Sequence, residues 1–304
     1  MEILYKNSGY LIVLLSLIVF FAIRIAAVLR IKRSLRQLEY FEADKLTGSF
    51  EETKPKFSLN KKSEFGVLLL HGFSSSVNEF SGLIKELEAS SINYYAPGLT
   101  GFGINDVNQL CNVKYTDWLR DADNAYNILK SVNEKIVILG HSAGGALTLH
   151  IAARYNVPHI FLTAPYIIVN RKHKLFHTLF SIPVIYDLIK VINPVVSKSK
   201  TRNNHNKKRF VYDAVPIMAV KAVWDLAKST DLGKLNKSEL YLFTGKNDNT
   251  VYEEDLLDLF GKSKVKYSHK SYALSGHNIL EDKEAESVVK DIMEKLLALV
   301  QSGR

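Results

Sequence analysis

Residues 140–144, with the sequence G-H-S-A-G, can present a serine hydroxyl as a nucleophile. They follow the apolar run Lys135–Leu139, typical of a buried strand, and open the small-residue run Ser142–Tyr155, typical of a helix. A sharp strand-to-helix turn exposes the serine Oγ, and flanking glycines remove side chains that would clash. The helix N-terminus adds free N–H groups where negative charge develops. The motif therefore predicts a nucleophile at Ser142; a glycine-rich helix start without a catalytic role is the alternative.

A serine nucleophile needs a base, and the base needs a carboxylate that orients it. Asp248 lies just past the apolar run Glu239–Thr244, and His277 lies just past the run Lys266–Leu274. Both runs are predicted strands, and the chain order serine, acid, histidine is typical of this kind of triad. We therefore predict a catalytic triad of Ser142, Asp248 and His277. Taken singly, Asp248 could instead be a solvated loop aspartate, and His277 a surface histidine.

The developing oxyanion needs hydrogen-bond donors. The predicted strand Gly66–Leu70 ends in the turn H-G-F at residues 71–73, which should present a backbone N–H to the oxyanion. We expect the N–H groups of Phe73 and Ala143 to be the two donors, and His71 to support the turn.

The remaining histidines are expected to be structural. Of the nine in the chain, His277 is the one that follows the acid in a loop. His269 falls in the preceding strand pattern, where it packs or faces solvent. His141, His150 and His159 are assigned no catalytic part.

The elements that position these residues alternate between strand and helix patterns. Strands are predicted at 66–70, 93–96, 135–139, 157–162, 239–244 and 266–274, and helices at 78–88, 116–130, 142–155, 253–260 and 281–300. Such alternation indicates an α/β fold with a mainly parallel sheet, helices on both faces and a site at the carboxyl ends of the strands. Residues 166–235 interrupt the alternation and are predicted to be a cap insertion.

Several motifs between residues 66 and 299 follow one another in the order of a known family. They are L-L-L-H-G-F, Y-A-P-G-L-x-G-F-G, D-W, G-H-S-A-G-G, G-K-N-D and S-G-H. With them the chain resembles the α/β-hydrolase superfamily and, within it, the bacterial carboxylesterase and monoacylglycerol lipase group. The resemblance implies an α/β-hydrolase fold with a cap, an acyl-enzyme mechanism, and no cofactor or metal.

The resemblance also carries over to single residues. The chain differs at Gly101-Phe102-Gly103, where the family often has G-H-G, and this change affects the shape of the pocket rather than the triad. The positions that match the family triad and its oxyanion donors are Ser142, Asp248, His277, Phe73 and Ala143.

The N-terminus contains an apolar run of 20 residues, Tyr10–Leu29, interrupted by Ser16 and Arg24. About 20 apolar residues suffice for a helix to cross the hydrocarbon core of a bilayer, and an arginine near one end can extend toward the headgroups. Four basic residues follow between positions 30 and 36. We predict that residues 1–38 form a single-pass membrane anchor with a basic flank. The positive-inside rule places the catalytic part in the cytoplasm.

Two other interpretations of this apolar run fit the sequence less well. A cleaved signal peptide should be basic before its apolar run, yet Lys6 is the one basic residue there and Glu2 opposes it. A buried core helix should be less uniformly apolar.

The net charge of +9 over 304 residues is unevenly distributed. Residues 1–62 carry +5, residues 166–212 carry +9, and the rest of the chain carries −5. This pattern excludes a uniformly basic nucleic-acid-binding protein and favours a membrane surface as a partner. The apolar content of 47% excludes a disordered chain, and the single cysteine, Cys111, excludes an intrachain disulfide and a cysteine-rich metal site. Polar residues 39–62 are predicted to be a linker, with a short strand near Phe57, and residues 63–304 the hydrolase domain.

The predicted function is a membrane-anchored serine hydrolase that cleaves lipophilic acyl esters, such as monoacylglycerols or lysophospholipids, through an acyl-enzyme on Ser142. The basic run Lys198–Arg209 either attracts anionic headgroups or is a solvated loop. An acyltransferase or a thioesterase could use the same triad. Ser142 disfavours the superfamily enzymes that use an aspartate nucleophile. The complete triad disfavours an inactive scaffold. No feature of the sequence supports a peptidase. The oligomeric state stays open.

Overall fold

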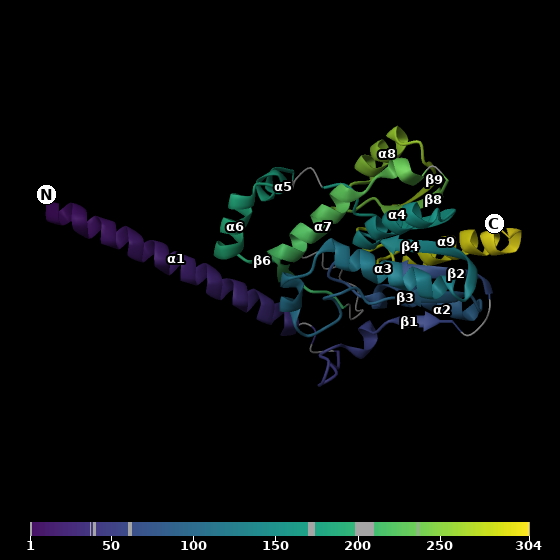
Figure 1. The fold of residues 1–304 in the computed structure, drawn as a ribbon, viewed down its shortest axis with the longest axis horizontal. Helices are drawn as coiled ribbons and strands as arrows, with labels where there is room; N and C mark the ends of the chain where they lie inside the picture. Colours follow the sequence, from purple (N-terminus) through teal and green to yellow (C-terminus); the bar gives the residue numbers. More distant parts are fainter. Residues whose placement is uncertain are drawn as a thin grey trace.

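The computed structural model describes residues 2–36, 38, 41–59, 63–169, 174–197, 210–235 and 237–303 (Figure 1). The basic run Lys198–Arg209 lies outside the described residues, so its expected role at a membrane surface stays a prediction.

A seven-stranded sheet with the order β1-β3-β2-β4-β5-β8-β9 forms the centre of the protein. All neighbouring pairs are parallel except β1 with β3, which is antiparallel. The mainly parallel sheet predicted from the alternation of patterns is confirmed. The strands are β1 (Lys56–Ser58), β2 (Ser63–Leu70), β3 (Asn93–Ala96), β4 (Asn133–His141), β5 (His159–Thr163), β8 (Glu239–Gly245) and β9 (Lys266–Tyr272).

Helices cover both faces of this sheet. Successive residues of the central strands point to opposite faces and are apolar on each, so both faces need to be covered. Leu68 and Leu70 of β2 belong to a core shared with α3, α4 and α8, whereas Val67 and Leu69 belong to a core shared with α2 and α9. These helices are α2 (Ser81–Ala89), α3 (Tyr115–Lys130), α4 (Ala143–Tyr155), α8 (Glu253–Lys262) and α9 (Ala285–Ser302), with the short 3₁₀ helices η1 (Glu51–Thr53), η2 (Val77–Phe80) and η3 (Val107–Cys111).

The segment predicted to be a linker is packed onto the hydrolase body where it is described. β1 pairs with β3 as an edge strand, close to the position expected for a short strand. Phe41 and Phe50 are buried, and their rings lie 5.5 and 5.0 Å from the ring of Phe210. A few aromatic side chains in a polar stretch therefore suffice to attach residues 41–59 to the core, which their average composition conceals.

Between β5 and β8 the chain forms an additional group of elements, at the place of the predicted insertion (Figure 1). The last helix of the group, α7, contacts α4, the helix that follows Ser142. Phe180 of α5 is buried, with its ring 5.1 Å from that of Trp224 of α7. The group contains α5 (Lys174–Phe180), α6 (Pro183–Ile192), β6 (Val195–Ser197) paired antiparallel with β7 (Ala214–Pro216), α7 (Ile217–Ser229) and η5 (Leu232–Leu235).

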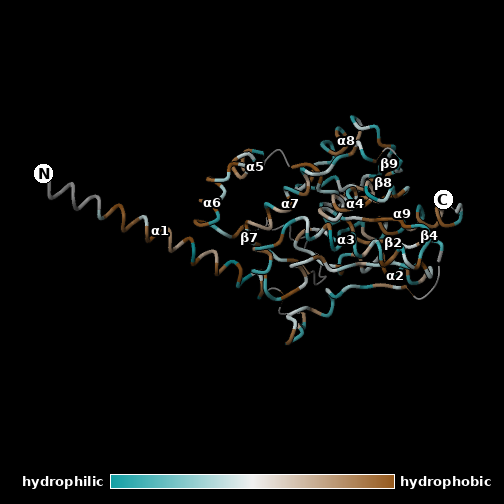
Figure 2. The backbone as a smooth tube through the Cα atoms, viewed as in Figure 1, coloured by the Kyte–Doolittle hydropathy of each residue, from teal (hydrophilic) through white to brown (hydrophobic). Residues whose placement is uncertain are grey.

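The N-terminal helix α1 (Glu2–Arg36) extends away from the body (Figure 1). Most of its hydrophobic part, brown in Figure 2, projects beyond the body. Within it, Tyr10–Arg36 is long and apolar enough to cross a membrane. Its C-terminal part packs on the body: Ala27 and Ser34 are buried, and Ser34 Oγ accepts hydrogen bonds from the N–H groups of Asp213 and Ala214, at 2.8 and 3.1 Å.

Candidate active site

The turn between β4 and α4 has the strained geometry expected of a nucleophile-bearing serine. Ser142 has φ 53° and ψ −117°, a backbone conformation that is unfavourable for a residue with a Cβ. A Cβ on Gly144 would lie 1.8 Å from the carbonyl oxygen of Leu70, and one on Gly140 would lie 2.2 Å from Oγ1 of Thr148. The two glycines of the motif are therefore required by close backbone packing.

Hydrogen bonds to neighbouring strands hold Ser142 in this conformation. Its N–H donates to the carbonyl oxygen of Thr163, at 3.0 Å, at the end of β5. Its own carbonyl oxygen accepts from the N–H groups of Gly145, at 2.9 Å, and Tyr166, at 2.8 Å. The strain is thus balanced by contacts on both sides of the residue, and the hydroxyl is fixed before any substrate binds.

The structure brings together the three residues predicted to form a triad. His277 Nε2 lies 2.8 Å from Ser142 Oγ, and His277 Nδ1 lies 2.8 Å from Asp248 Oδ2. With the proton on Nδ1, the imidazole donates to the carboxylate, and its Nε2 lone pair accepts the serine hydroxyl proton. All three come from strand ends, since Ser142 follows β4, Asp248 follows β8 and His277 follows β9.

The loop after β8 holds Asp248 by its second oxygen. Oδ1 accepts the N–H groups of Thr250 and Val251, at 2.7 and 2.9 Å, so Oδ2 is the oxygen that faces the histidine. The side chain of Asp248 is 2% exposed, which excludes competing water from the carboxylate–imidazole contact.

An ion pair joins the two ends of that loop, between Lys246 Nζ and Glu253 Oε1 at 2.7 Å. Burial raises the pKa of Glu253, but hydrogen bonds from Lys246, Ser271 and Thr244 lower it more, to about 2. Glu253 is therefore ionised and ties the start of α8 to β8 and β9. Glu253 was not predicted from the sequence, although a glutamate at a predicted helix start near the acid was a usable signal.

The loop of His277 is held in a similar way by acidic side chains. Gly276 N–H donates to Asp282 Oδ2, at 2.7 Å, and Ser275 Oγ donates to Glu284 Oε2, at 2.8 Å. A Cβ on Gly245 would lie 2.4 Å from the Gly276 carbonyl oxygen, so this glycine lets the loops of Asp248 and His277 approach each other. Nothing local in the sequence distinguishes these acidic residues from solvated ones.

The turn at residues 71–73, predicted to hold one oxyanion donor, lies against Ser142. A Cβ on Gly72 would lie 3.3 Å from the Cβ of Ser142. The Gly72 N–H donates to the buried carboxylate of Glu79, at 2.8 Å, so this group is not available to a substrate. The ring of Phe73 packs 5.6 Å from that of Phe102. Glu79 was not anticipated, since a lone glutamate before a helix usually faces solvent.

His71 supports this turn, as expected from the sequence. Its Nδ1 donates to the carbonyl oxygen of Gly72, at 3.0 Å, and its Nε2 accepts the N–H of Leu99, at 3.3 Å. Burial lowers the pKa of His71 to about 4, so the ring is neutral at physiological pH. His71 thus connects the turn to the loop that contains residues 99–103.

Three other histidines, all within the described part of the chain, also contact groups outside the candidate triad. His141 Nδ1 lies 3.0 Å from the carbonyl oxygen of Thr163, and His150 Nε2 lies 3.0 Å from Ser229 Oγ. His269 Nε2 lies 2.7 Å from Thr244 Oγ1, beside Glu253.

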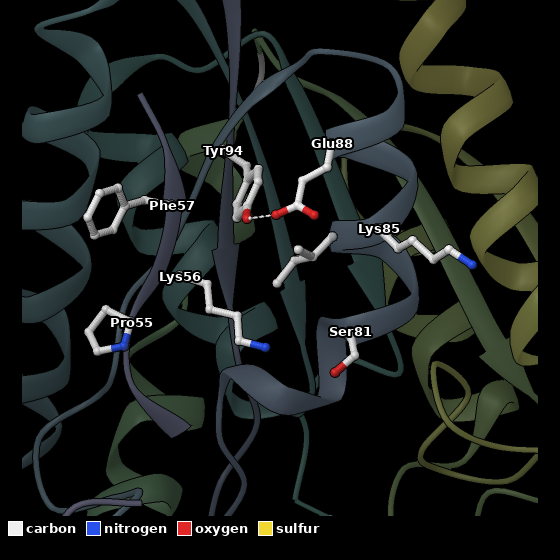
Figure 3. Close-up of a pocket in the computed structure, with 8 residues that line it drawn as sticks. Pro55, Lys56, Phe57, Ser81, Lys85, Glu88 and Tyr94 are labelled. Atoms are coloured by element: carbon white, nitrogen blue, oxygen red, sulfur yellow. Dashed lines mark hydrogen bonds between the residues drawn. The ribbon is translucent and has the colours of Figure 1, made fainter. Parts of the chain in front are cut away.

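A separate cavity of about 480 Å³ lies at the β1 edge of the sheet (Figure 3). Figure 3 shows the lysine of β1 directed toward α2, while Tyr94 OH donates to Glu88, at 2.6 Å. No triad residue lines this cavity, so it is not part of the candidate active site. Within the described part of the chain, no cluster of three histidine, cysteine or acidic side chains is arranged to hold a metal ion.

The fold and this site define the class of the protein: it is an α/β hydrolase of the esterase and lipase type. The chain matches, over residues 61–284, the model of the Hydrolase_4 family, described as "Serine aminopeptidase, S33", and it belongs to that family.

Curated relatives agree with this assignment. The chain is 24% identical over 245 residues to a carboxylesterase of Bacillus subtilis (strain 168). This alignment covers 80% of this chain and 96% of the relative. It is also 29% identical over 90 residues to a thermostable monoacylglycerol lipase of Bacillus sp. (strain H-257). That alignment covers 30% of this chain and 36% of the relative.

Solved structures share the fold at low sequence identity. A structure reported with the metagenome-derived lipolytic enzymes LipS and LipT superimposes with a TM-score of 0.71 at 19% identity, covering 83% of this chain and 98% of that chain. The monoacylglycerol lipase of Paleococcus ferrophilus superimposes with a TM-score of 0.61 at 20% identity, covering 77% of this chain and 94% of that chain.

Proposed function

We propose that the protein is a membrane-anchored serine hydrolase that cleaves lipophilic carboxylic esters through an acyl-enzyme on Ser142. The observation that carries the proposal is the continuous hydrogen-bonded line from Ser142 Oγ through His277 to Asp248, with both contacts at 2.8 Å. Ester substrates are supported by the carboxylesterase and lipase relatives.

In the proposed mechanism, Ser142 Oγ attacks the ester carbonyl carbon while its proton moves to His277 Nε2. Asp248 keeps the imidazole in the required tautomer and stabilises its charged form. The N–H groups of Phe73 and Ala143 bind the oxyanion. The tetrahedral intermediate expels the alcohol, which takes the proton from His277. Water then attacks the acyl-enzyme carbonyl carbon and gives a proton to His277. His277 returns this proton to Ser142 Oγ as the second tetrahedral intermediate expels the serine and releases the acid.

The contacts of α1 support a retained anchor over a cleaved signal peptide. Ala27 and Ser34 are buried against the body, and Ser34 accepts two backbone hydrogen bonds from the chain near β7. Cleavage after the apolar run would remove part of this packing. The four basic residues at positions 30–36 lie on the body side of the run, which favours a cytoplasmic hydrolase domain.

We propose further that residues 166–235 are the cap of a hydrolase domain at 63–304, and that lipophilic esters such as monoacylglycerols are the substrates. The cap assignment is supported by the position of these elements between β5 and β8 and by the packing of α7 on α4. The substrate class is supported by the apolar helix that would hold the enzyme at a bilayer.

Ser142→Ala tests the catalytic assignment. We expect at least a 10³-fold loss of ester hydrolysis and complete loss of fluorophosphonate labelling, because the nucleophile is removed while the fold is kept. Ser302→Ala, at the exposed end of α9, is the matched control and should keep both. Labelling that persists in Ser142→Ala would overturn the assignment.

A series of p-nitrophenyl esters and monoacylglycerols of increasing chain length tests the substrate class. We expect kcat/KM to rise with acyl length. Equal rates for acetyl and long-chain esters would contradict a lipophilic substrate.

Two other activities, acyl transfer and thioester hydrolysis, could use the same site. They differ from ester hydrolysis in the acyl acceptor and in the bond that is cleaved. An acyltransferase or thioesterase would show acyl transfer to an added alcohol, or faster turnover of acyl thioesters than of esters. The family description as a serine aminopeptidase makes an aminoacyl p-nitroanilide the third substrate to test. Turnover of the anilide without ester turnover would replace the esterase proposal.

A further inference from the structure

Helix α6 carries a row of exposed apolar side chains that no described part of the protein covers. Val184, Leu188 and Val191 are 78%, 56% and 53% exposed. Their spacing of four and three residues places them on one face of the helix. The charged residues Asp187 and Lys190 flank this face and pair with each other, at 2.8 Å.

The preceding helix α5 continues the apolar surface. Leu175 and Phe176 are 73% and 55% exposed, and Ile182 at the bend between the helices is 44% exposed. The two helices meet at a bend of 100°. We call the exposed apolar side chains of residues 175, 176, 182, 184, 188 and 191 the hairpin surface.

Helix α6 is attached to α1 at its C-terminal end. Arg24 Nη1 donates to the carbonyl oxygen of Val191, at 3.1 Å, and Arg30 Nη2 donates to Asn193 Oδ1, at 2.7 Å. The carbonyl of Val191 is among the last four of the helix, which have no partner within it. Two arginines of the apolar helix therefore fix where α6 lies along α1.

This attachment sets the depth of α6 relative to a bilayer. If the 20-residue run Tyr10–Leu29 spans the hydrocarbon core, Arg24 lies five residues inside its boundary, or about 7.5 Å along the helix axis. Amphipathic helices that lie in a membrane interface bury their apolar face by about 5–10 Å. The Arg24 contact thus places the end of α6 at the depth where such helices reside.

We infer that the hairpin surface is a second membrane contact, which inserts into the same leaflet that α1 enters. The inference rests on the proposed role of α1 as an anchor and adds that the cap itself lies in the interface. The occupant is the lipid at the headgroup–acyl boundary, because the exposed face is apolar, lies next to α1, and has its charges paired at the flank.

Inserted this way, the cap would open toward the acyl chains. The chain continues from α6 through β6 and β7 into α7, which packs on α4 behind Ser142. A lipid ester would then pass from the leaflet to the nucleophile beneath the cap. Esters dissolved in water would not need this contact.

Depth-dependent quenching tests the inference in the full chain. With Cys111→Ser as background, a fluorophore is placed at Leu188→Cys, at Val19→Cys in the anchor, or at Asp258→Cys on exposed α8 as control. The proteins are reconstituted in phosphatidylcholine–phosphatidylglycerol vesicles that contain nitroxide-labelled lipid. We expect quenching at positions 188 and 19 and none at position 258.

The outcomes separate the two proposals. Quenching at position 19 but not at 188 would overturn the inference and leave the anchor in place. No quenching at either position would overturn both the inference and the anchor. If the labelled protein shows no quenching at 188, and unlabelled Leu188→Cys forms a disulfide between two copies under mild oxidation, the occupant is a second copy of the chain and the inference is overturned. Fluorophosphonate labelling of each variant reports the catalytic site independently.

A second measurement uses activity. We expect Leu188→Glu to lower the hydrolysis of monoacylglycerol in vesicles about ten-fold and to leave hydrolysis of a soluble short-chain ester unchanged. Leu46→Glu, which changes a loop leucine that is 94% exposed, is the matched control and should change neither. Equal rates of Leu188→Glu and Leu46→Glu on vesicles would overturn the inference.

Discussion

The side chains in the loops that bear Ser142, Asp248 and His277 have very different surroundings from those of the α1–α6 region. Around Ser142, hydrogen bonds within the protein connect Ser142, His277 and Asp248, and the side chains of Ser142 and Asp248 are buried. Along α1 and α6, large apolar side chains are exposed, and arginines make the links between the helices. The first region pairs its polar groups within the protein, whereas the second leaves a large apolar surface exposed, as expected if it contacts a membrane as proposed above.

The largest effect is expected from Asp248→Asn, which tests whether the catalytic region depends on its internal bonds. An amide cannot stabilise the protonated imidazole and favours the wrong tautomer, so kcat should fall roughly 10³- to 10⁴-fold. Steady-state kinetics with a soluble ester measures the loss. Asp258→Asn, an exposed aspartate on α8, is the control, and a loss below ten-fold in Asp248→Asn would contradict the role of the carboxylate.

A pH effect on stability should come next in size. Burial holds the pKa of His71 at about 4, below its value of 6.5 in the unfolded chain. Below pH 6.5 the unfolded chain gains a proton that the folded protein does not bind until about pH 4, so stability is lost as pH falls through this window. The loss amounts to about 3 kcal/mol.

Urea unfolding in detergent micelles at pH 7 and pH 4.5 measures this dependence. The difference between the two pH values should be larger in the wild type than in His71→Gln, which cannot titrate. Equal differences in the two proteins would show that His71 does not carry the effect.

A smaller loss is expected when the contact that supports the turn at residues 71–73, the proposed source of one oxyanion donor, is removed. Glu79→Ala deletes the acceptor of the Gly72 N–H, which should loosen the turn that contains Phe73 and lower kcat about ten-fold with little change in KM. Glu79→Gln keeps an acceptor oxygen and should recover most of the activity. Glu86→Ala, on the exposed face of α2, is the control, and a rise in KM alone would assign Glu79 to substrate binding instead.

The smallest effect is expected from Arg24→Leu, which removes a link within the α1–α6 region. The Leu side chain keeps α1 apolar but cannot donate to Val191, so α6 should move more freely while Arg30 still holds it. Hydrogen exchange of the α6 amides should rise a few-fold, with exchange in α4 unchanged as the internal control. Unchanged α6 exchange would show that Arg24 does not restrain the helix.

The sequence predicted the sheet, and it predicted that Ser142, Asp248 and His277 lie together, because both predictions depend on local signals. Apolar runs define the strands, and G-H-S-A-G at residues 140–144 has a backbone reason for each glycine. Glu79 and Glu253 were not predicted, because their burial depends on contacts with residues distant in the sequence or with an adjacent turn. The attachment of residues 41–59 was hidden for the same reason, since Phe50 meets Phe210 across 160 positions.

The hydrogen bonds of Ser34 to Asp213 and Ala214 bear on how a water-soluble form of this protein can be made. Deleting the whole N-terminal helix would remove Ser34 and Ala27, and would uncover Val195 and Ala214, with which Ala27 packs. Deleting residues 1–22 would instead remove much of the exposed apolar surface and keep these contacts. The choice of truncation point therefore decides whether the soluble protein retains the packing that holds β6 and β7.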